Sequence, residues 1–286
     1  MALSKLSGDE QRIIFSQLSR NVLDARVAVA FSSASSELRE LTQVECQPLK
    51  AGYQAAAALG RKAGVRSCKE LREAKAVDWC DTGLSSDDLA LLGTLGSLLP
   101  ALEQLDLHAP AAGPDGVQRL AAKLGAGALP AVTVLQLVGT HVGDAGASAL
   151  AAALGRGAMP RLKCLVLART AIGDAGLLAL APALRRRPAL EYLVLRGNRF
   201  SVEGLAALVA PPPPAGAPPT TTTAGGLAKL KELGLSSTQI TDAGCATLSA
   251  ALDSCALPAL VRLYLGGIPA SAPSKRAVYA ARAGLQ

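Results

Sequence analysis

The sequence contains very few aromatic residues. Its 286 residues include three phenylalanines, four tyrosines and one tryptophan. Half of the residues are hydrophobic, so the chain can bury a core and is not disordered overall. That core must be built from leucine, alanine and valine, which suits a protein made of thin, similar layers.

No segment has the composition of a membrane span or a secretion signal. The first residues, MALSKLSGDE, lack an apolar core, and no uninterrupted apolar stretch is long enough to cross a bilayer. The six cysteines include no C-x-x-C pair and no cluster with histidine, which argues against a zinc site or a disulfide framework. We therefore expect reduced thiols and a cytoplasmic or nuclear protein that does not bind membranes.

The excess positive charge is confined to one part of the chain. The formal net charge is +7, yet residues 1–100 are balanced, with 12 basic and 12 acidic side chains. The excess lies in residues 101–286, where Lys123, Arg156 and the run 185–187 fall at predicted helix C-termini, which favour cations. Because aromatic residues are few and no groove-reading motif occurs, we expect no nucleic-acid partner.

A short frame of apolar residues, L-x-x-L-x-L, recurs along the chain. Its starting positions lie 30, 30, 28, 40 and 30 residues apart, and after each of the first five frames a glycine follows by nine positions. The frames are Leu102-Leu105-Leu107, Val132-Leu135-Leu137, Leu162-Leu165-Leu167, Leu190-Leu193-Leu195, Leu230-Leu233-Leu235 and Leu260-Leu263-Leu265. A weaker copy, Leu71-Ala74-Ala76, precedes them. The pattern predicts a repeat of about 30 residues.

Each repeat is predicted to be a strand, a turn and a helix. The alternation in the frame places successive apolar side chains on one face of a short strand. In the second full repeat we expect Asp144 to cap the helix of its own repeat and Gly155 to end that helix in a left-handed conformation. One such unit cannot bury both its strand face and its helix face, so the copies must stack into a solenoid.

The frame, the glycine and the helical leucines of residues 68–286 resemble a leucine-rich repeat protein of the ribonuclease-inhibitor-like subclass. This resemblance implies an α/β solenoid, a right-handed βα horseshoe of about seven repeats with a parallel sheet on its concave face. The asparagine usual three places after the frame occurs only as Asn198, and Thr140, Thr170 and Thr238 take the equivalent places. Threonine can still hydrogen-bond to the turn, so we expect the same architecture with a slightly looser ladder.

Residues 1–45 do not follow the repeat and are predicted to form a small helical module. Ser7 and Glu10 have the spacing of a capping box ahead of an apolar helix. Residues 46–67 are predicted to form a helical connector. The simplest role for the module is a cap that shields the first repeat from water.

Residues 6–41 are also similar to an F-box, which implies docking on a Skp-type adaptor of a cullin ubiquitin ligase. In that alternative the chain would be the substrate receptor of the ligase. The candidate adaptor-binding residues are Leu6, Ile14, Phe15, Leu18, Val27 and Phe31.

Three further features fall within residues 68–286. Residues 210–226 are rich in proline and threonine and are predicted to form a loop that lengthens one repeat. The last residues are predicted to form a capping helix that closes the solenoid. Trp79, the single tryptophan, is expected to pack at the domain junction.

The side chains between the frame residues are predicted to point to the concave side of the sheet, because alternate strand positions face opposite ways. In the central repeats they are mostly apolar, and toward both ends they are polar. The candidate partner-binding residues are Val134, Gln136, Val138, Cys164, Val166, Tyr192, Val194, Arg196, Glu232, Arg262 and Tyr264. An apolar patch with a polar rim resembles a protein-binding surface, so we expect it to bind another protein. The alternative is that β-branched residues occur there because they suit strands.

No catalytic motif is recognisable. His108 and His141 fall at different phases of the repeat and are not expected to converge. Neither H-E-x-x-H nor G-x-x-x-x-G-K-[ST] occurs. We therefore expect a non-catalytic scaffold that needs no cofactor and no metal. GTPase activators for Ran also use this repeat subclass, so the resemblance leaves GTPase activation as a further alternative.

Overall fold

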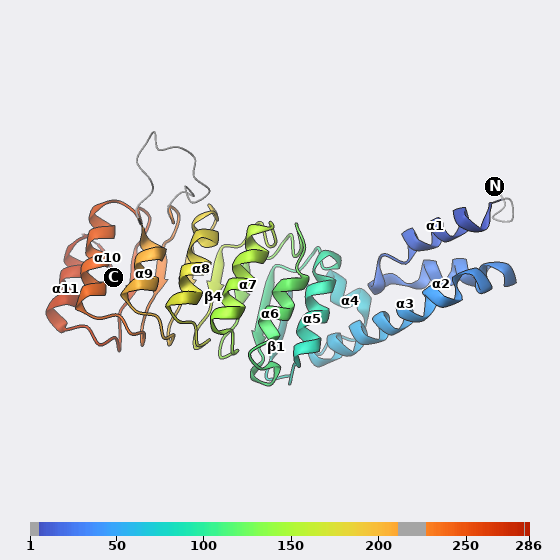
Figure 1. Ribbon diagram of the computed structural model, residues 1–286, viewed down its shortest axis with the longest axis horizontal. Helices are drawn as coiled ribbons and strands as arrows, with labels where there is room; N and C mark the ends of the chain where they lie inside the picture. Colours follow the sequence, from blue (N-terminus) through green and yellow to red (C-terminus); the bar gives the residue numbers. More distant parts are fainter. Residues whose placement is uncertain (1–5, 211–226, 283) are drawn as a thin grey trace. The chain divides into compact units, whose positions relative to one another are not determined.

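The computed structural model describes residues 6–210, 227–282 and 284–286, so the loop predicted at 210–226 lies, apart from Ala210, outside the described residues. The chain divides into two compact units, Met1–Ala74 and Lys75–Gln286. We call them the helical unit and the repeat unit, since the second alternates strands with helices (Figure 1).

The helical unit contains one long helix and several short ones. Its elements are α1 (Gly8–Leu18), the 3-10 turn η2 (Val22–Asp24), α2 (Arg26–Ser33), α3 (Ser36–Lys62) and α4 (Cys68–Glu73). The predicted capping box is confirmed, because the Ser7 N–H donates to Glu10 Oε2 at 2.8 Å and the Glu10 N–H donates to Ser7 Oγ at 3.3 Å.

Helix α3 runs through the predicted boundary between residues 45 and 46, although Pro48 lies inside it. Proline removes one backbone hydrogen bond from a helix. Cys46 and Leu49, on either side of Pro48, are both buried, so packing holds the helix together at this point.

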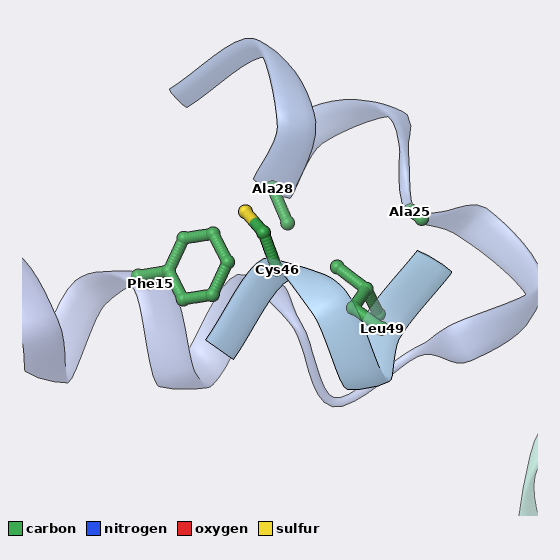
Figure 2. Close-up of a cluster of buried hydrophobic side chains, with 5 residues drawn as sticks. All are labelled: Phe15, Ala25, Ala28, Cys46 and Leu49. Carbon is green, nitrogen blue, oxygen red and sulfur yellow. The ribbon is translucent and has the colours of Figure 1, made fainter. Parts of the chain in front are cut away.

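A small apolar core holds α1, α2 and α3 together (Figure 2). It consists of Phe15, Ala25, Ala28, Cys46 and Leu49, with Leu18, Val22, Val29 and Phe31 packed against it. A buried polar contact supports it, because the hydroxyl oxygens of Ser32 and Thr42 lie 2.7 Å apart. The Thr42 hydroxyl also donates to the carbonyl of Leu38 at 2.7 Å, which leaves no unsatisfied polar atom in this group.

Within the described residues the repeat unit contains one seven-stranded parallel sheet whose strands follow chain order. The strands are β1 (Ala76–Cys80), β2 (Gln104–His108), β3 (Val134–Gln136), β4 (Cys164–Val166), β5 (Tyr192–Val194), β6 (Glu232–Gly234) and β7 (Arg262–Tyr264). The helices are α5 (Ser86–Leu95), α6 (Gly116–Lys123), α7 (Gly143–Gly155), α8 (Asp174–Arg185), α9 (Val202–Val209), α10 (Asp242–Asp253) and α11 (Ala272–Ala280), with short 3-10 turns η3 (Gly96–Leu98) and η4 (Pro110–Ala112). This is the predicted solenoid.

The frame leucines form the core of the repeat unit. The middle leucine of each frame lies opposite the middle leucine of the next in the strand register, from Leu105 on β2 to Leu263 on β7. All of these side chains are buried. Each buried leucine contributes about 1.5–3 kcal/mol, so stacking rather than hydrogen bonding within one repeat stabilises the unit.

The predicted frame of the first repeat was wrong by three residues. The register places Val77 opposite Leu105 and Trp79 opposite Leu107, while Leu71 belongs to α4. Ser67 caps α4 by accepting the N–H of Glu70 at 3.1 Å, which draws Leu71 into a helix. Trp79 is therefore a fully buried frame residue. A search for leucines misses this frame because valine and tryptophan replace two of them.

Two predictions about α7 were also wrong in detail. Asp144 does not cap α7 but accepts the N–H groups of Gly173 and Gly176, at 2.7 and 2.9 Å, at the start of α8. Gly155 is the last residue of α7, and the left-handed residue is Gly157, with φ 93°. The Gly157 N–H donates to Leu154 O at 2.9 Å and the N–H of residue 158 donates to the carbonyl of residue 153 at 3.1 Å, the bonding of a Schellman motif.

Polar side chains join neighbouring repeats at several levels. The Asn198 amide donates to the carbonyls of Leu167 and Leu195 at 2.6 and 2.8 Å, so it bridges two turns. Thr238 reaches only the carbonyl of Leu235 in its own repeat, at 2.7 Å. Thr140 bonds to the preceding repeat, because its hydroxyl accepts the Ala109 N–H at 3.2 Å and donates to the Leu107 carbonyl at 3.4 Å. Threonine therefore still hydrogen-bonds to a turn, as predicted, with fewer bonds between repeats than Asn198.

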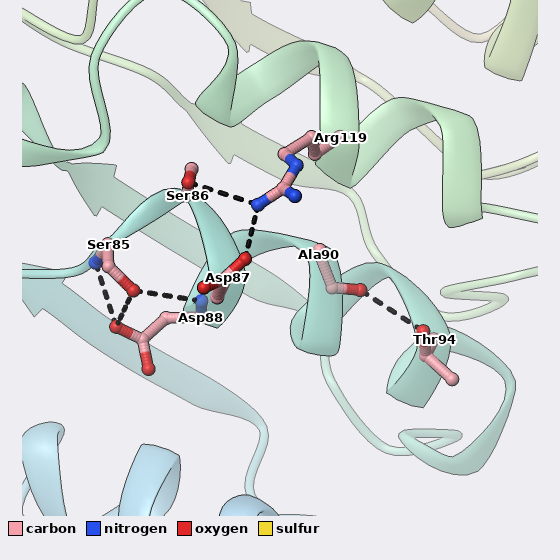
Figure 3. Close-up of polar contacts among 7 residues, drawn as sticks. All are labelled: Ser85, Ser86, Asp87, Asp88, Ala90, Thr94 and Arg119. Carbon is pink, nitrogen blue, oxygen red and sulfur yellow. Dashed lines mark hydrogen bonds and ion pairs between the residues drawn. The ribbon is translucent and has the colours of Figure 1, made fainter.

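The helices are also bridged by side chains at their ends. At the start of α5, Ser85 and Asp88 form a second capping box, and Arg119 from α6 bonds to Ser86 and Asp87 (Figure 3). At the other end, Arg156 after α7 donates to the carbonyl of Ala121 in α6 at 2.8 Å. The prediction of cations near helix C-termini is confirmed there, and the helix concerned belongs to the preceding repeat.

Candidate functional site

The residues between the frame positions form rows across the sheet. The first row runs through Ala76, Gln104, Val134, Cys164, Tyr192, Glu232 and Arg262, and the second through Asp78, Asp106, Gln136, Val166, Val194, Gly234 and Tyr264. The pairing continues past the strand ends, because the Gly139 N–H donates to Ala168 O at 2.9 Å. Val138, Ala168 and Arg196 therefore follow in a third row. We call these rows the exposed sheet face.

All eleven predicted partner-binding residues lie in these three rows. The apolar ones in the centre, such as Val134, Val166 and Val194, are half-buried, whereas the frame leucines beside them are fully buried. The alternation of a strand explains both observations, since frame positions face the helices and the positions between them face outward. The structure thus brings the residues together on one face, while their role in binding stays a prediction.

Gly234 interrupts the apolar surface between β5 and β7. A Cβ atom at this position would lie 3.2 Å from Cγ1 of Val194, so the neighbouring valine fills the space beside it. Tyr264 on β7 is 46% exposed and lies beyond this interruption. The apolar part of the face therefore ends at β5.

The C-terminal end of the face carries a paired charge. Arg262 Nη1 lies 3.4 Å from Glu232 Oε2 on the adjacent strand. A shallow depression of about 190 Å³ is lined there by Tyr192, Lys231, Glu232, Val261 and Arg262. A partner side chain could lie against the Tyr192 ring at this point.

The N-terminal end of the face is acidic. Asp78 on β1 lies opposite Asp106 on β2 in the register. Asp106 Oδ2 accepts the Gln104 amide at 2.7 Å, while its Oδ1 is buried without a hydrogen-bond partner among the described residues. The Cys80 N–H donates to Asp78 Oδ1 at 2.8 Å, and bonding to Cys80 lowers the pKa of Asp78, which keeps that carboxylate ionised.

The surroundings of Cys80 disfavour the ionised form of its thiol. Partial burial, a hydrogen bond to Asp78 and the charges of Asp78, Asp106 and Asp81 raise the pKa of Cys80 to about 12. The thiol is therefore protonated and unreactive near neutral pH.

The two histidines lie in different places. His108 Nδ1 lies 3.0 Å from Asp81 Oδ1 at the edge of the exposed sheet face, whereas His141 is exposed in the turn before α7. Among the described residues no group of three His, Cys, Asp or Glu side chains is placed to hold a metal ion. No described helix has both the length and the apolar composition that a bilayer crossing requires.

Sequence reasoning missed Asp78 and Cys80. Both follow the predicted frame Leu71-Ala74-Ala76, which was wrong by three residues, so they were not assigned to the face. The alternation Val77, Trp79 against Asp78, Cys80 is the signal that could have found them.

The candidate adaptor-binding residues of the helical unit are mostly not exposed. Phe15 is fully buried in the core of Figure 2, and Leu18 and Phe31 pack against that core. Leu6 and Ile14 are half-buried, and Val27 alone of the six is largely exposed, at 56%. Most of the apolar side chains of this segment thus pack within the helical unit itself.

The stack of short parallel strands, each followed by a helix, defines an α/β solenoid. A family model described as "Leucine Rich repeat" matches residues 129–151, 159–181, 188–209 and 226–249. These four segments are leucine-rich repeats of the ribonuclease-inhibitor type.

Among solved structures, the chain is similar to internalin C2 (inlC2) from Listeria monocytogenes str. 4b F2365. The two are 18% identical, the alignment covers 78% of this chain and 78% of that chain, and the TM-score is 0.44. No curated protein matches the sequence.

Proposed function

We propose that this protein is a non-catalytic scaffold that binds a partner protein through the exposed sheet face. Leucine-rich repeat proteins generally bind proteins, which supports the coarse assignment.

One observation carries the proposal: apolar side chains lie in adjacent rows on a sheet face that no described helix covers. Cys164 lies opposite Tyr192, and Val166 lies opposite Val194, so four side chains that are neither polar nor fully buried meet on two strands. Gln136 and Arg196 border them. An apolar centre with a polar rim is the usual anatomy of a protein-binding surface, and tyrosine is enriched among the residues that dominate its energy.

The test is affinity capture from native lysate with matched variants of the full-length protein. Val166→Asp combined with Tyr192→Asp should remove the specific partners, because two desolvated carboxylates would oppose binding. The control is Leu178→Asp, which places the same charge on α8 at a side chain that is 48% exposed. Partners that bind the double variant as well as the wild type would refute the site, provided that thermal unfolding of all three proteins is alike.

The two alternatives taken from resemblance stay predictions. Docking of the helical unit on a Skp-type adaptor predicts that a chain beginning at Lys75 loses the adaptor and keeps its other partners. GTPase activation predicts faster hydrolysis when the protein is added to small GTPases. The cytoplasmic or nuclear location also stays a prediction.

A further inference from the structure

Two carboxylates lie side by side at the N-terminal end of the exposed sheet face without a neutralising cation. Asp78 and Asp106 are direct neighbours on β1 and β2. Neither forms an ion pair with another described residue, and their hydrogen-bond donors, the Cys80 N–H and the Gln104 amide, are neutral. Like charges on adjacent strands repel each other, so this arrangement costs stability in the free protein. A cation supplied by a partner would remove that cost.

The opposite charge lies on the same face directly after β5, at Arg196. The Arg196 side chain is exposed and forms no ion pair within the described part of the chain, unlike Arg262, which Glu232 neutralises. The Arg169 N–H donates to the Arg196 carbonyl at 2.8 Å, so a second exposed arginine lies on the neighbouring repeat. This end of the face therefore offers unpaired positive charge.

The charged ends are separated by the apolar centre of the face. From β2 to β5 there are three strand spacings of about 4.8 Å, or about 14 Å across the sheet. An extended segment rises about 3.3 Å per residue, so about five residues cover this distance. Val166 and Val194 lie between the two ends.

We propose that the exposed sheet face binds a linear segment of a partner protein with a lysine or arginine at one end, an apolar centre and an aspartate or glutamate at the other. The cation contacts Asp78 and Asp106, and the carboxylate contacts Arg196. This inference rests on the proposed function and adds the chemistry of the partner. A uniformly anionic partner, such as a nucleic acid, would be repelled at the two aspartates.

The experiment selects short random peptides, displayed on phage, against the immobilised full-length protein. Enriched peptides should carry opposite charges on either side of apolar residues. Replacing Asp78 and Asp106 by asparagine should lower the affinity for a synthesised peptide about fivefold or more, and so should replacing Arg196 by glutamine. Added salt should reduce the difference in affinity between these variants and the wild type. Asp115→Asn, in the turn before α6, is the matched control and should leave affinity unchanged. Folding is checked by thermal unfolding, in which Asp78→Asn should be at least as stable as the wild type.

Charge reversal provides the sharper test. Asp78→Lys with Asp106→Lys should abolish binding, and changing the peptide's basic residue to glutamate should restore it. Selected peptides that no longer bind the Val166→Asp, Tyr192→Asp variant, but lack a basic residue at one end and an acidic residue at the other, would overturn this inference. They would leave the proposed function standing. Peptides that bind this variant normally would overturn both. The absence of any enriched peptide would overturn only the inference of a linear segment, since the affinity capture described above tests the proposed function separately.

Discussion

The Asp174 carboxylate accepts the backbone N–H of Gly204, in the next repeat, at 2.8 Å. The same Oδ1 atom accepts the Ser201 N–H at 2.8 Å, and Oδ2 accepts the Ser201 hydroxyl at 2.9 Å. One repeat thus supplies the N-terminal cap for the helix of the following one. Asp144 does the same for α8 and Asp242 for α11, which couples neighbouring layers through specific polar bonds in addition to apolar contact.

Removing the Asp174 carboxylate should destabilise the repeat unit. Asp174→Ala leaves the first amides of α9 without an acceptor, and we expect a loss of about 1–2 kcal/mol in the free energy of unfolding. Urea unfolding followed by circular dichroism measures this. Asp115→Ala is the control, because Asp115 makes no side-chain cap bond, and it should change stability by less than about 0.5 kcal/mol. Equal losses in both variants would contradict the coupling.

The contact between Asp242 and α11 should make stability depend on pH. The Ser271 N–H, at 2.6 Å, lowers the pKa of Asp242 below that of an unfolded aspartate. A lowered pKa in the folded state means that the stabilisation is complete above the unfolded value of about 4 and is lost as the pH falls through the folded value. The difference in unfolding free energy between wild type and Asp242→Asn should therefore be constant from pH 7 to about 5 and shrink below pH 4. A difference that grows on acidification would contradict this cause.

Glycine is required where α8 approaches the preceding repeat closely. A Cβ atom on Gly176 would lie 2.5 Å from Oδ1 and 3.0 Å from Cα of Asp144, so Gly176→Ala must push α8 away or break the cap. We expect it to cost about 1–3 kcal/mol. The matched control is Gly155→Ala at the end of α7, where no atom lies within 4 Å and alanine's helix propensity should stabilise by up to about 1 kcal/mol. Thermal unfolding should show a lower unfolding temperature for Gly176→Ala and an equal or higher one for Gly155→Ala.

The acidic end of the exposed sheet face should control the reactivity of Cys80. Partial burial and the nearby aspartates raise the pKa of its thiol to about 12, so alkylation by iodoacetamide should be slow at pH 8. Asp78→Asn should speed alkylation of Cys80 and leave Cys255, which is exposed elsewhere, unchanged. Peptide mass spectrometry separates the two rates. An unchanged rate at Cys80 would show that Asp78 contributes little to the potential there.

Much of the fold could be predicted because the frame leucines keep their phase over six repeats. Alternation in a strand also sufficed to assign the outward-facing side chains, including Val166 and Tyr192. The bonds between repeats could not be predicted in the same way. Asp144 has the sequence context of a cap for its own helix, and only the stacking of α7 on α8 decides that it serves the next one.

The remaining errors have local causes. The first frame was misplaced because valine and tryptophan replace leucine at Val77 and Trp79. As a result Asp78, on which the inference about the partner depends, was not assigned to the exposed sheet face. Helix α3 continues through Pro48 because the neighbouring side chains Cys46 and Leu49 are buried, which the sequence pattern does not show. Side-chain distances, such as the 3.4 Å between Arg262 and Glu232, decide which charges on the face remain unpaired. The periodicity of the sequence does not give these distances.

The carboxylate that caps the next helix is missing at three internal junctions, since Ser86, Pro114 and Val202 take the place held by Asp144, Asp174 and Asp242. At the first two of these junctions an arginine bridges the helices, because Arg119 bonds to Ser86 and Arg156 donates to the carbonyl of Ala121. Within the described part of the chain, the link from α9 to α10 has neither a carboxylate cap nor an arginine bridge and depends on apolar contact. In a chain of nearest-neighbour layers, cooperativity is lost first at the weakest junction. Backbone amides of α10 and α11 should consequently exchange with deuterium as one block, ahead of α7 and α8, and the protein would unravel from its C-terminal end.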